Sequence, residues 1–155
     1  TGQIDSPEYY YSFAEMNDER ETRLVAKQSF IFTRFHLDDR ISTGIANHLK
    51  SEWVGNYFKG KRGDKMVVVK KGKNVVGFLQ LLVKPETIII DLIAILPEHR
   101  RKGLAGNMIR FAINELYNGH QLLVGTQIAN IPSLKLYQQL GFIIQNAQYV
   151  FHIYN

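Results

Sequence analysis

The stretch RRKGLAG, residues 100–106, combines the residue types that hold a phosphate group. A helix start leaves several backbone N–H groups without partners and carries a partial positive charge, so it attracts anions. Gly103 permits close approach of the backbone, and the small Ala105 and Gly106 leave space across the first helical turn. The three preceding cations add full charges. On these residues alone, an exposed basic loop at the start of a helix is the alternative interpretation.

Two further residues have the chemistry of an acid or a base. Asp91 interrupts the apolar run TIIIDLIAIL, and a buried carboxylate there needs a partner or a raised pKa. A structural role is the alternative for Asp91. Tyr137 shares one helical stripe with Leu134 and Leu140, a position that is more often part of a core.

Hydrophobic periodicity predicts the elements that position these residues. Apolar residues recur every four positions over 41–58, which predicts an amphipathic helix. Runs 65–71 and 74–83, joined by a short turn containing Gly72, predict a hairpin. The nearly continuous apolar run 87–96 predicts a strand buried on both faces.

The remaining elements complete one domain over residues 1–155. The predicted elements are a helix over 104–116, a buried strand over 121–129, a helix with Asn130 as N-cap and Gly141 just past its end, and a terminal hairpin of 142–145 with 149–154. The order predicts an α/β (α+β) domain around one central mixed sheet. Residues 1–28 are weakly determined, as an edge strand or as the remnant of a longer N-terminal region.

Composition excludes several classes of site and partner. The 155 residues include no cysteine, which removes disulfides and thiolate chemistry, and no metal site is expected. No apolar run reaches the length of a membrane span and no signal peptide is recognisable, so we expect a cytoplasmic protein without a membrane partner. The net charge of +5 suits a polyanion, but the basic patches lack the interleaved aromatic residues of a nucleic-acid surface, which stays the alternative of another class.

The segment IAILPEHRRKGLAGNMI resembles the acetyl-CoA-binding segment of the GNAT superfamily of N-acetyltransferases. The superfamily's signature is Arg or Gln, two residues, Gly, one residue, then Gly or Ala, and Arg100, Gly103 and Ala105 satisfy it. The segment NIPSLKLYQQLGF has the residues and spacing of the second motif. The resemblance covers residues 65–154. It implies a GNAT fold, with a mostly antiparallel sheet of six to seven strands, flanked by helices, that splays at an acetyl-CoA cleft.

The resemblance also implies roles for individual residues. Tyr137 is the general acid that protonates the leaving CoA thiolate, although transfer from a phenol to a thiolate is uphill by about 2 kcal/mol at ordinary pKa values. Asp91 is the candidate base, with His36, Glu98 or a water chain as alternatives. The implied cofactor-binding residues are Ile93, Ala94 and Ile95 in the strand, Arg100, Arg101, Lys102, Gly103, Leu104, Ala105 and Gly106 in the loop and helix start, and Asn130, Ser133 and Tyr137 in the second motif.

The implied acceptor is a primary amine. The segments TQIANIPSLKLYQQLGF and AQYVFHIY are most similar to bacterial enzymes that acetylate nucleotide-linked amino sugars, such as the TDP-fucosamine acetyltransferases. Arg34, His36 and Trp53 are then candidates for binding the diphosphate and the base, with a helix face and solvated charges as the alternative for each. Relatives that acetylate protein N-termini often carry Glu where this chain has Gly125. A polyamine, small amine or peptide acceptor, a non-catalytic acyl-CoA-binding module, and a homodimer stay open.

Overall fold

Five strands form one mixed sheet in the part of the chain that the computed structural model describes, residues 8–29, 43–116, 118–126, 130–145 and 147. The strands are β1 (Tyr9–Phe13), β2 (Lys65–Lys71), β3 (Asn74–Val83), β4 (Thr87–Ile95) and β5 (Gln121–Val124), and they lie in that order across the sheet. The first four pair antiparallel, whereas β5 runs parallel to β4. The α/β class and the mostly antiparallel sheet confirm the prediction, with five described strands in place of six to seven.

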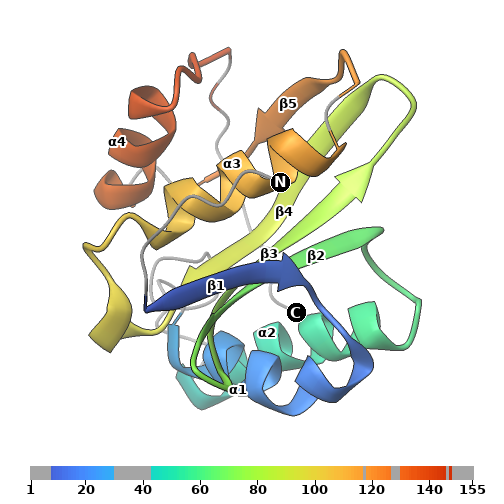
Figure 1. Ribbon diagram of the computed structural model, residues 1–155, viewed down its shortest axis with the longest axis vertical. Helices are drawn as coiled ribbons and strands as arrows, with labels where there is room; N and C mark the ends of the chain where they lie inside the picture. The colour runs from blue at the N-terminus through green and yellow to red at the C-terminus, as the bar shows by residue number, and fades with distance from the viewer. Residues whose placement is uncertain (1–7, 30–42, 117, 127–129, 146, 148–155) are drawn as a thin grey trace, which may run out of the picture.

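Helices cover both faces of this sheet (Figure 1). The helices are α1 (Glu19–Ser29), α2 (Thr43–Phe58), α3 (Leu104–Leu116) and α4 (Ile131–Gln139), with short 3-10 turns η1 (Met16–Asp18) and η2 (Pro97–His99). The first two helices lie on one face, and α3 with α4 lies on the other. No helix in the described part is long and apolar enough to cross a membrane.

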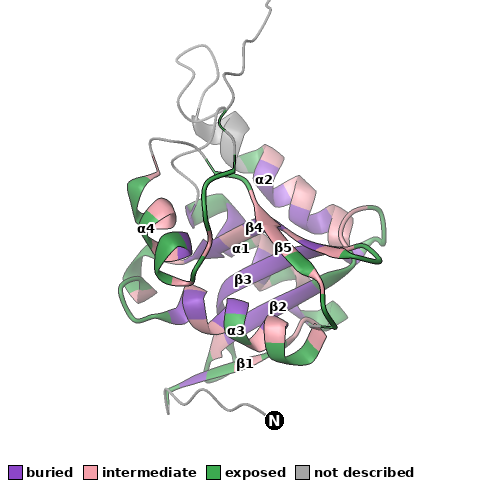
Figure 2. Ribbon diagram, turned by 90° about the horizontal axis from the view of Figure 1, so that it is seen from above, coloured by how far each residue is buried: buried purple, intermediate pink, exposed green. Residues whose placement is uncertain are grey.

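The core is split by the sheet into two layers. In β2, Met66 and Val68 pack with residues of α1 and α2, whereas Val67 and Val69 pack with residues of α3. Figure 2 shows the result, with buried residues concentrated along the central strands. Because both faces are covered, β2 and β3 are buried almost throughout. Strand β4, predicted to be buried on both faces, instead alternates between half-buried and buried residues.

Helix α1 lies in the segment that the sequence left undetermined. Its sequence, ERETRLVAKQS, is dominated by charged and polar residues, and Val25 and Ala26 supply its buried apolar surface. Two apolar residues make too weak a stripe for a periodicity argument. The predicted edge strand in the same segment is present as β1.

The C-terminal third differs from the prediction in two ways. Strand β5 ends at Val124 and is half-buried, because the described part of the sheet ends with it, so the prediction of a buried strand over 121–129 was too long. Residues 142–145, predicted as a strand, have no regular structure. Their predicted hairpin partner, 149–154, lies outside the described residues.

Gly77 of β3 provides a test of how tightly the strands pack. A Cβ at this position would collide with Ile95 Cδ1 and would lie 3.0 Å from the backbone oxygen of Ala94. We expect Gly77→Ala to lower the free energy of unfolding by about 1–3 kcal/mol, the usual cost of overpacking. Urea denaturation measures it. Gly125→Ala is the matched control, because no described atom lies within 4 Å of its Cβ, and equal effects of the two substitutions would contradict the argument.

Candidate active site

A β-bulge at Asp91 shapes the centre of the site. In the pairing of β3 with β4, Leu81 lies opposite Ile90 and Gln80 lies opposite Leu92, so Asp91 is the extra residue. Before the bulge, Ile90 faces α3, and after it Leu92 faces α1 and α2. Asp91 and Leu92 therefore point to the same face, and the bulge shifts the facing of every later residue of β4 by one position.

Beyond the bulge, β4 has an edge that no described strand pairs with. Strand β5 pairs with the residues from Thr87 to Ile90, and its described pairing stops there. The Leu96 N–H donates to the Val76 carbonyl (2.8 Å), so by the antiparallel alternation the peptide groups of Ile93 and Ile95 face away from β3. The strand thus presents the N–H and carbonyl of Ile93 and the N–H of Ile95 at residues for which the sequence predicts cofactor binding, whereas the Ile95 carbonyl accepts from Arg100 Nε.

The loop after β4 turns its backbone toward the start of α3. Arg101 has φ = 62° and Gly103 has φ = 75°, both in the left-handed region that non-glycine residues rarely adopt. Left-handed residues in such a loop turn successive N–H groups toward one side, a geometry that binds anions. The Asn107 N–H donates to the Gly103 carbonyl (3.0 Å), so the amides of Leu104, Ala105 and Gly106 precede the first bond within the helix.

Arg100 anchors this loop rather than extending from it. Its Nε donates to the Ile95 carbonyl (3.1 Å) and its Nη2 to the Ser29 carbonyl at the end of α1 (2.6 Å). Arg101 and Lys102 are exposed. All three predicted cations are exposed, and Arg100 differs from the other two because its side chain also holds the backbone.

The small residues at the start of α3 have different surroundings. The absent side chain of Gly106 faces α4, where a Cβ would lie 3.6 Å from Leu136 and 3.9 Å from Leu140. Around Gly103 no described atom lies within 4 Å of a Cβ, so its positive φ and not lack of space favours glycine. A Cβ at Gly106 would thus make only ordinary van der Waals contacts, so packing does not require glycine there, whereas Gly103 permits the loop conformation.

The second predicted motif forms the start of α4. The Asn130 side chain accepts from the Ser133 N–H (3.3 Å), which is the N-cap role that the sequence predicted. Pro132 lies in the first turn. Asn130 and Ser133 are both half-buried.

Tyr137 lies in the core on the α3 side of the sheet. It is 5% exposed, and its ring packs edge-on against Phe142 at 5.6 Å between centroids. Burial raises the pKa of Tyr137 to about 12. The phenol is therefore protonated over the whole physiological range, and it is a weaker acid than a free tyrosine.

Asp91 has the partners that a carboxylate in an apolar strand requires. Arg62 donates to both of its oxygens, from Nη2 to Oδ1 (2.8 Å) and from Nε to Oδ2 (2.9 Å). Gln80 Nε2 also donates to Oδ2 (2.9 Å). Three hydrogen bonds thus hold a side chain that is 11% exposed, in the bidentate geometry that makes arginine pairs strong.

Of the three predicted substrate residues, the structure describes one. Trp53 of α2 has Lys50 Nζ 4.2 Å from its ring centre and the Arg62 guanidinium 5.1 Å from it, both within the range of cation–π attraction. Arg62 therefore connects Trp53 to Asp91. The other two, Arg34 and His36, lie outside the described residues. His36 was also one of the candidate bases.

Sequence analysis did not single out Arg62 and Gln80. Arg62 lies in the turn GKRGD, where a basic residue suggests only solvation. Gln80 is a polar residue within the apolar strand VVGFLQLLV, as Asp91 is in the next strand. Two such interruptions in adjacent strands are the signal that predicts a buried polar pair.

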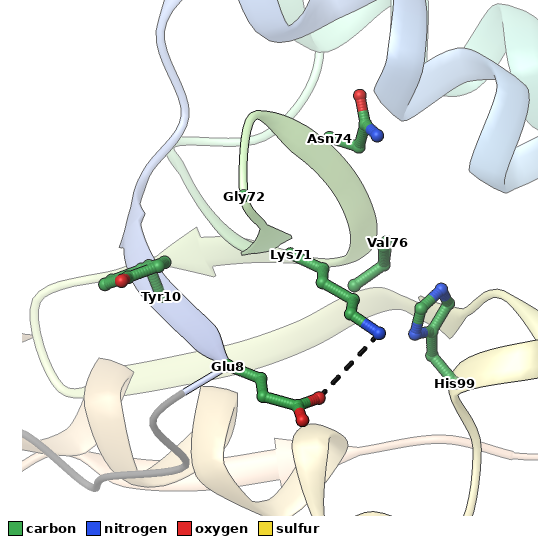
Figure 3. Close-up of a pocket in the computed structure, with 7 residues that line it drawn as sticks. All are labelled: Glu8, Tyr10, Lys71, Gly72, Asn74, Val76 and His99. Carbon is green, nitrogen blue, oxygen red and sulfur yellow. Dashed lines mark ion pairs between the residues drawn. The ribbon is translucent and has the colours of Figure 1, made fainter.

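A separate hollow of about 550 Å³ lies at the end of the sheet (Figure 3). Its lining residues are Glu8, Tyr10, Lys71, Gly72, Asn74, Val76 and His99. Its two opposite charges pair with one another, with Lys71 Nζ 3.7 Å from a Glu8 carboxylate oxygen. His99 also bonds the Tyr9 hydroxyl through Nδ1 (2.9 Å), which ties β1 to η2 just before the loop. None of the seven residues was predicted as a site residue.

Glu98, the other candidate base, is exposed on η2. Across the described ranges, no three His, Cys, Asp or Glu side chains gather closely enough to hold a metal ion.

Comparison with known sequences identifies relatives. The sequence model of the acetyltransferase (GNAT) family matches residues 31–142. The spore coat polysaccharide biosynthesis protein SpsD of Bacillus subtilis is 30% identical over 132 residues, which are 84% of this chain and 45% of SpsD. An N-alpha-acetyltransferase of Saccharolobus solfataricus is 32% identical over 53 residues, 32% of each chain. The chain thus spans less than half the length of these two relatives.

Solved structures share the fold. The ribosomal-protein-S18-alanine N-acetyltransferase of Escherichia coli superposes with a TM-score of 0.65 at 18% identity, over 86% of this chain and 76% of that one. The PaiA N-acetyltransferase of Thermoplasma acidophilum, solved with coenzyme A, has a TM-score of 0.70 at 11% identity. The match covers 90% of this chain and 92% of the PaiA chain. At these identities the likeness concerns the fold.

The raised pKa of Tyr137 predicts a specific dependence of stability on pH. An unfolded tyrosine loses its proton near pKa 10, whereas the folded Tyr137 keeps its own up to about 12, so the unfolded state binds fewer protons between these values. The contribution of Tyr137 is therefore fully present below about pH 10 and falls by about 1.4 kcal/mol per pH unit above it.

Urea unfolding of the unaltered chain and of Tyr137→Phe measures this contribution. The difference between the two free energies should be constant up to about pH 9 and then move in favour of the phenylalanine variant. The comparison cancels the titration of every other tyrosine and lysine. A difference that stays constant to about pH 11.5 would contradict the assignment.

Proposed function

The chain belongs to the acetyltransferase (GNAT) family, and we propose that it transfers the acetyl group of acetyl-CoA to a primary amine by direct attack of the amine on the thioester. One observation carries the proposal: the open edge of β4 leads directly into a loop with left-handed residues and the start of α3. The edge offers peptide groups to an amide-containing chain, and the loop offers N–H groups to phosphates.

In this proposal the cofactor follows the path from β4 to α3. The Ile93 peptide group and the Ile95 N–H, which face the open edge on either side of Ala94, pair with the pantetheine arm. The amides of residues 101–106 hold the pyrophosphate, and the exposed side chains of Arg101 and Lys102 add charge. Arg100 contributes by fixing the loop to Ile95, and Asn130 and Ser133 approach the cofactor from the start of α4. The family membership supports the assignment, as does the PaiA enzyme, which shares the fold and was solved in complex with coenzyme A.

Tyr137 acts in this proposal as a hydrogen-bond donor to the departing thiolate. With a pKa of about 12, full proton transfer to a thiolate whose thiol has a pKa of about 8.5 is uphill by about 5 kcal/mol. The thiolate forms in the same cleft, where desolvation raises the pKa of the thiol as well, so the gap narrows in the complex. A positioned donor stabilises the developing charge before any proton moves.

The acceptor side lies where Trp53, Arg62 and Asp91 meet on the α2 face of the sheet. The hydrogen bonds from Arg62 and Gln80 occupy the Asp91 carboxylate, so we assign removal of the ammonium proton to water rather than to Asp91. A nucleotide-linked amino sugar is the acceptor that we propose. The spore coat polysaccharide function in the name of SpsD supports it, and the aromatic face of Trp53 flanked by two cations suits a base and a diphosphate.

Titration calorimetry with CoA tests the cofactor assignment. We expect one site per chain and no heat with duplex DNA under the same conditions. Absence of CoA binding would overturn the proposed function, and DNA binding instead would favour a basic nucleic-acid module. An acetyl-transfer screen against nucleotide-linked amino sugars, polyamines and N-terminal peptides then identifies the acceptor class.

Tyr137→Phe tests the donor to the thiolate. Removal of the hydroxyl keeps the ring that packs against Phe142, so we expect CoA affinity within about twofold of the unaltered chain and a turnover lower by about 10²–10⁴-fold. Steady-state kinetics with the best acceptor of the screen measures the turnover, and calorimetry measures the CoA affinity. Phe142→Leu, which changes the same ring contact without touching the hydroxyl, is the matched control. Unchanged turnover of Tyr137→Phe would remove Tyr137 from the chemistry.

A further inference from the structure

We infer that Arg62 and Gln80 are positioning residues for the open edge of β4, where we place the cofactor. They hold this edge, the cofactor edge, open by fixing Asp91 in the bulge. The inference rests on the proposed function, because it assigns these residues to the acetyl-CoA site. Both residues act through the Asp91 carboxylate, which accepts two hydrogen bonds from Arg62 and one from Gln80 at 2.8–2.9 Å.

The bulge leaves the orientation of Asp91 open. Between Ile88 and Ile95, Asp91 is the only residue without a partner in the described register with β3, so the ladder itself does not fix its orientation. The side-chain bonds to Gln80 of β3 and to Arg62 supply the missing restraint. They hold Asp91 on the α2 face and thereby fix the bulge, and beyond it the ladder with β3 places the peptide groups of Ile93 and Ile95 on the open edge.

Gln80 contributes little to the stability of the core. It is fully buried, and its Oε1 has no hydrogen-bond partner among the described residues. A buried acceptor without a partner is unfavourable, so an apolar residue of similar size would serve the core at least as well. The amide is held in this orientation because its Nε2 donates to Asp91, since the reverse orientation would place Oε1 against a carboxylate. Gln80 thus orients Asp91 while one of its own buried atoms stays without a hydrogen bond.

Arg62 links the bulge to the acceptor side of the sheet. Its side chain is 40% exposed, which by itself would leave its position loose. Two contacts restrain it: the fork to Asp91 and the face of Trp53, 5.1 Å away. Helix α2, the turn before β2, and the bulge of β4 are thereby linked through one side chain. Positioning of the cofactor edge is then coupled to the surface where we place the acceptor.

Calorimetry with CoA tests the inference without knowledge of the acceptor. We expect Arg62→Met and Asp91→Ala each to weaken CoA binding about tenfold, and the double variant to match the single ones because the two residues act as one unit. Gln80→Met should weaken CoA binding by a smaller factor while its thermal midpoint stays equal or rises. Lys61→Met is the matched control: it removes a cation from the exposed neighbour of Arg62 in the same turn and should bind as the unaltered chain does.

Hydrogen exchange of peptides covering residues 91–96 distinguishes positioning from a loss of general stability. CoA should slow exchange there in the unaltered chain and in Lys61→Met, and much less in Arg62→Met, while exchange in α3 is unchanged. Exchange that rises throughout the chain, CoA binding by Arg62→Met within about twofold of the control, or additive effects in the double variant would overturn the inference. Failure of the unaltered chain to bind CoA would overturn the proposed function, and this inference with it, and is visible before any variant is measured.

Discussion

The bidentate contact between Arg62 and Asp91 is the interaction on which the geometry of the site depends. The inserted residue shifts the facing of β4 beyond Ile90, the point at which the described pairing with β5 also stops while the pairing with β3 continues. A carboxylate at the inserted position would be costly without partners, and the fork from Arg62 together with the Gln80 amide offsets that cost. In our proposal this arrangement holds the edge of β4 beyond the bulge in position for the cofactor.

The loop after β4 is likewise held by contacts from distant parts of the chain. Its left-handed residues turn backbone N–H groups outward, a conformation that free peptides avoid. Three hydrogen bonds to other parts of the chain hold it: Arg100 donates to the carbonyls of Ile95 and Ser29, and His99 bonds Tyr9 of β1. The loop is thus fixed by its neighbours before any ligand arrives, which lowers the entropy lost when a phosphate binds.

The two faces of the sheet divide the proposed chemistry. Tyr137 lies on the α3 face, in an apolar environment that keeps its phenol neutral. Trp53, Arg62 and Asp91 lie on the α2 face, where charges pair with one another and with an aromatic ring. A thioester that passes through the open edge of β4 would have a proton donor on one side and a polar surface for the amine on the other. In this proposal the bulge allows both faces to reach one reacting carbonyl.

The sequence by itself determined the elements of the site and their order. Apolar runs located β2 to β4, the spacing of apolar residues located α2 and α3, Gly103 marked the turn before α3, and Asn130 marked the start of α4. These features are local, since each depends on residues within one turn or one strand. The prediction of a terminal strand over 142–145 was wrong, and α1 was not predicted. The first segment is too short and the second too polar to carry a clear local signal.

Only the tertiary structure decided what the polar residues do. It assigned Arg100 to backbone carbonyls and Asp91 to a network with Arg62 and Gln80. Arg100 and Ser29 lie 71 positions apart in the sequence, Arg62 and Asp91 lie 29 apart, and Gln80 and Asp91 lie 11 apart. No local pattern contains such distances along the chain. The sequence therefore predicted that the Asp91 carboxylate needs a partner. The packing of the turn before β2 against the sheet determined that this partner is Arg62.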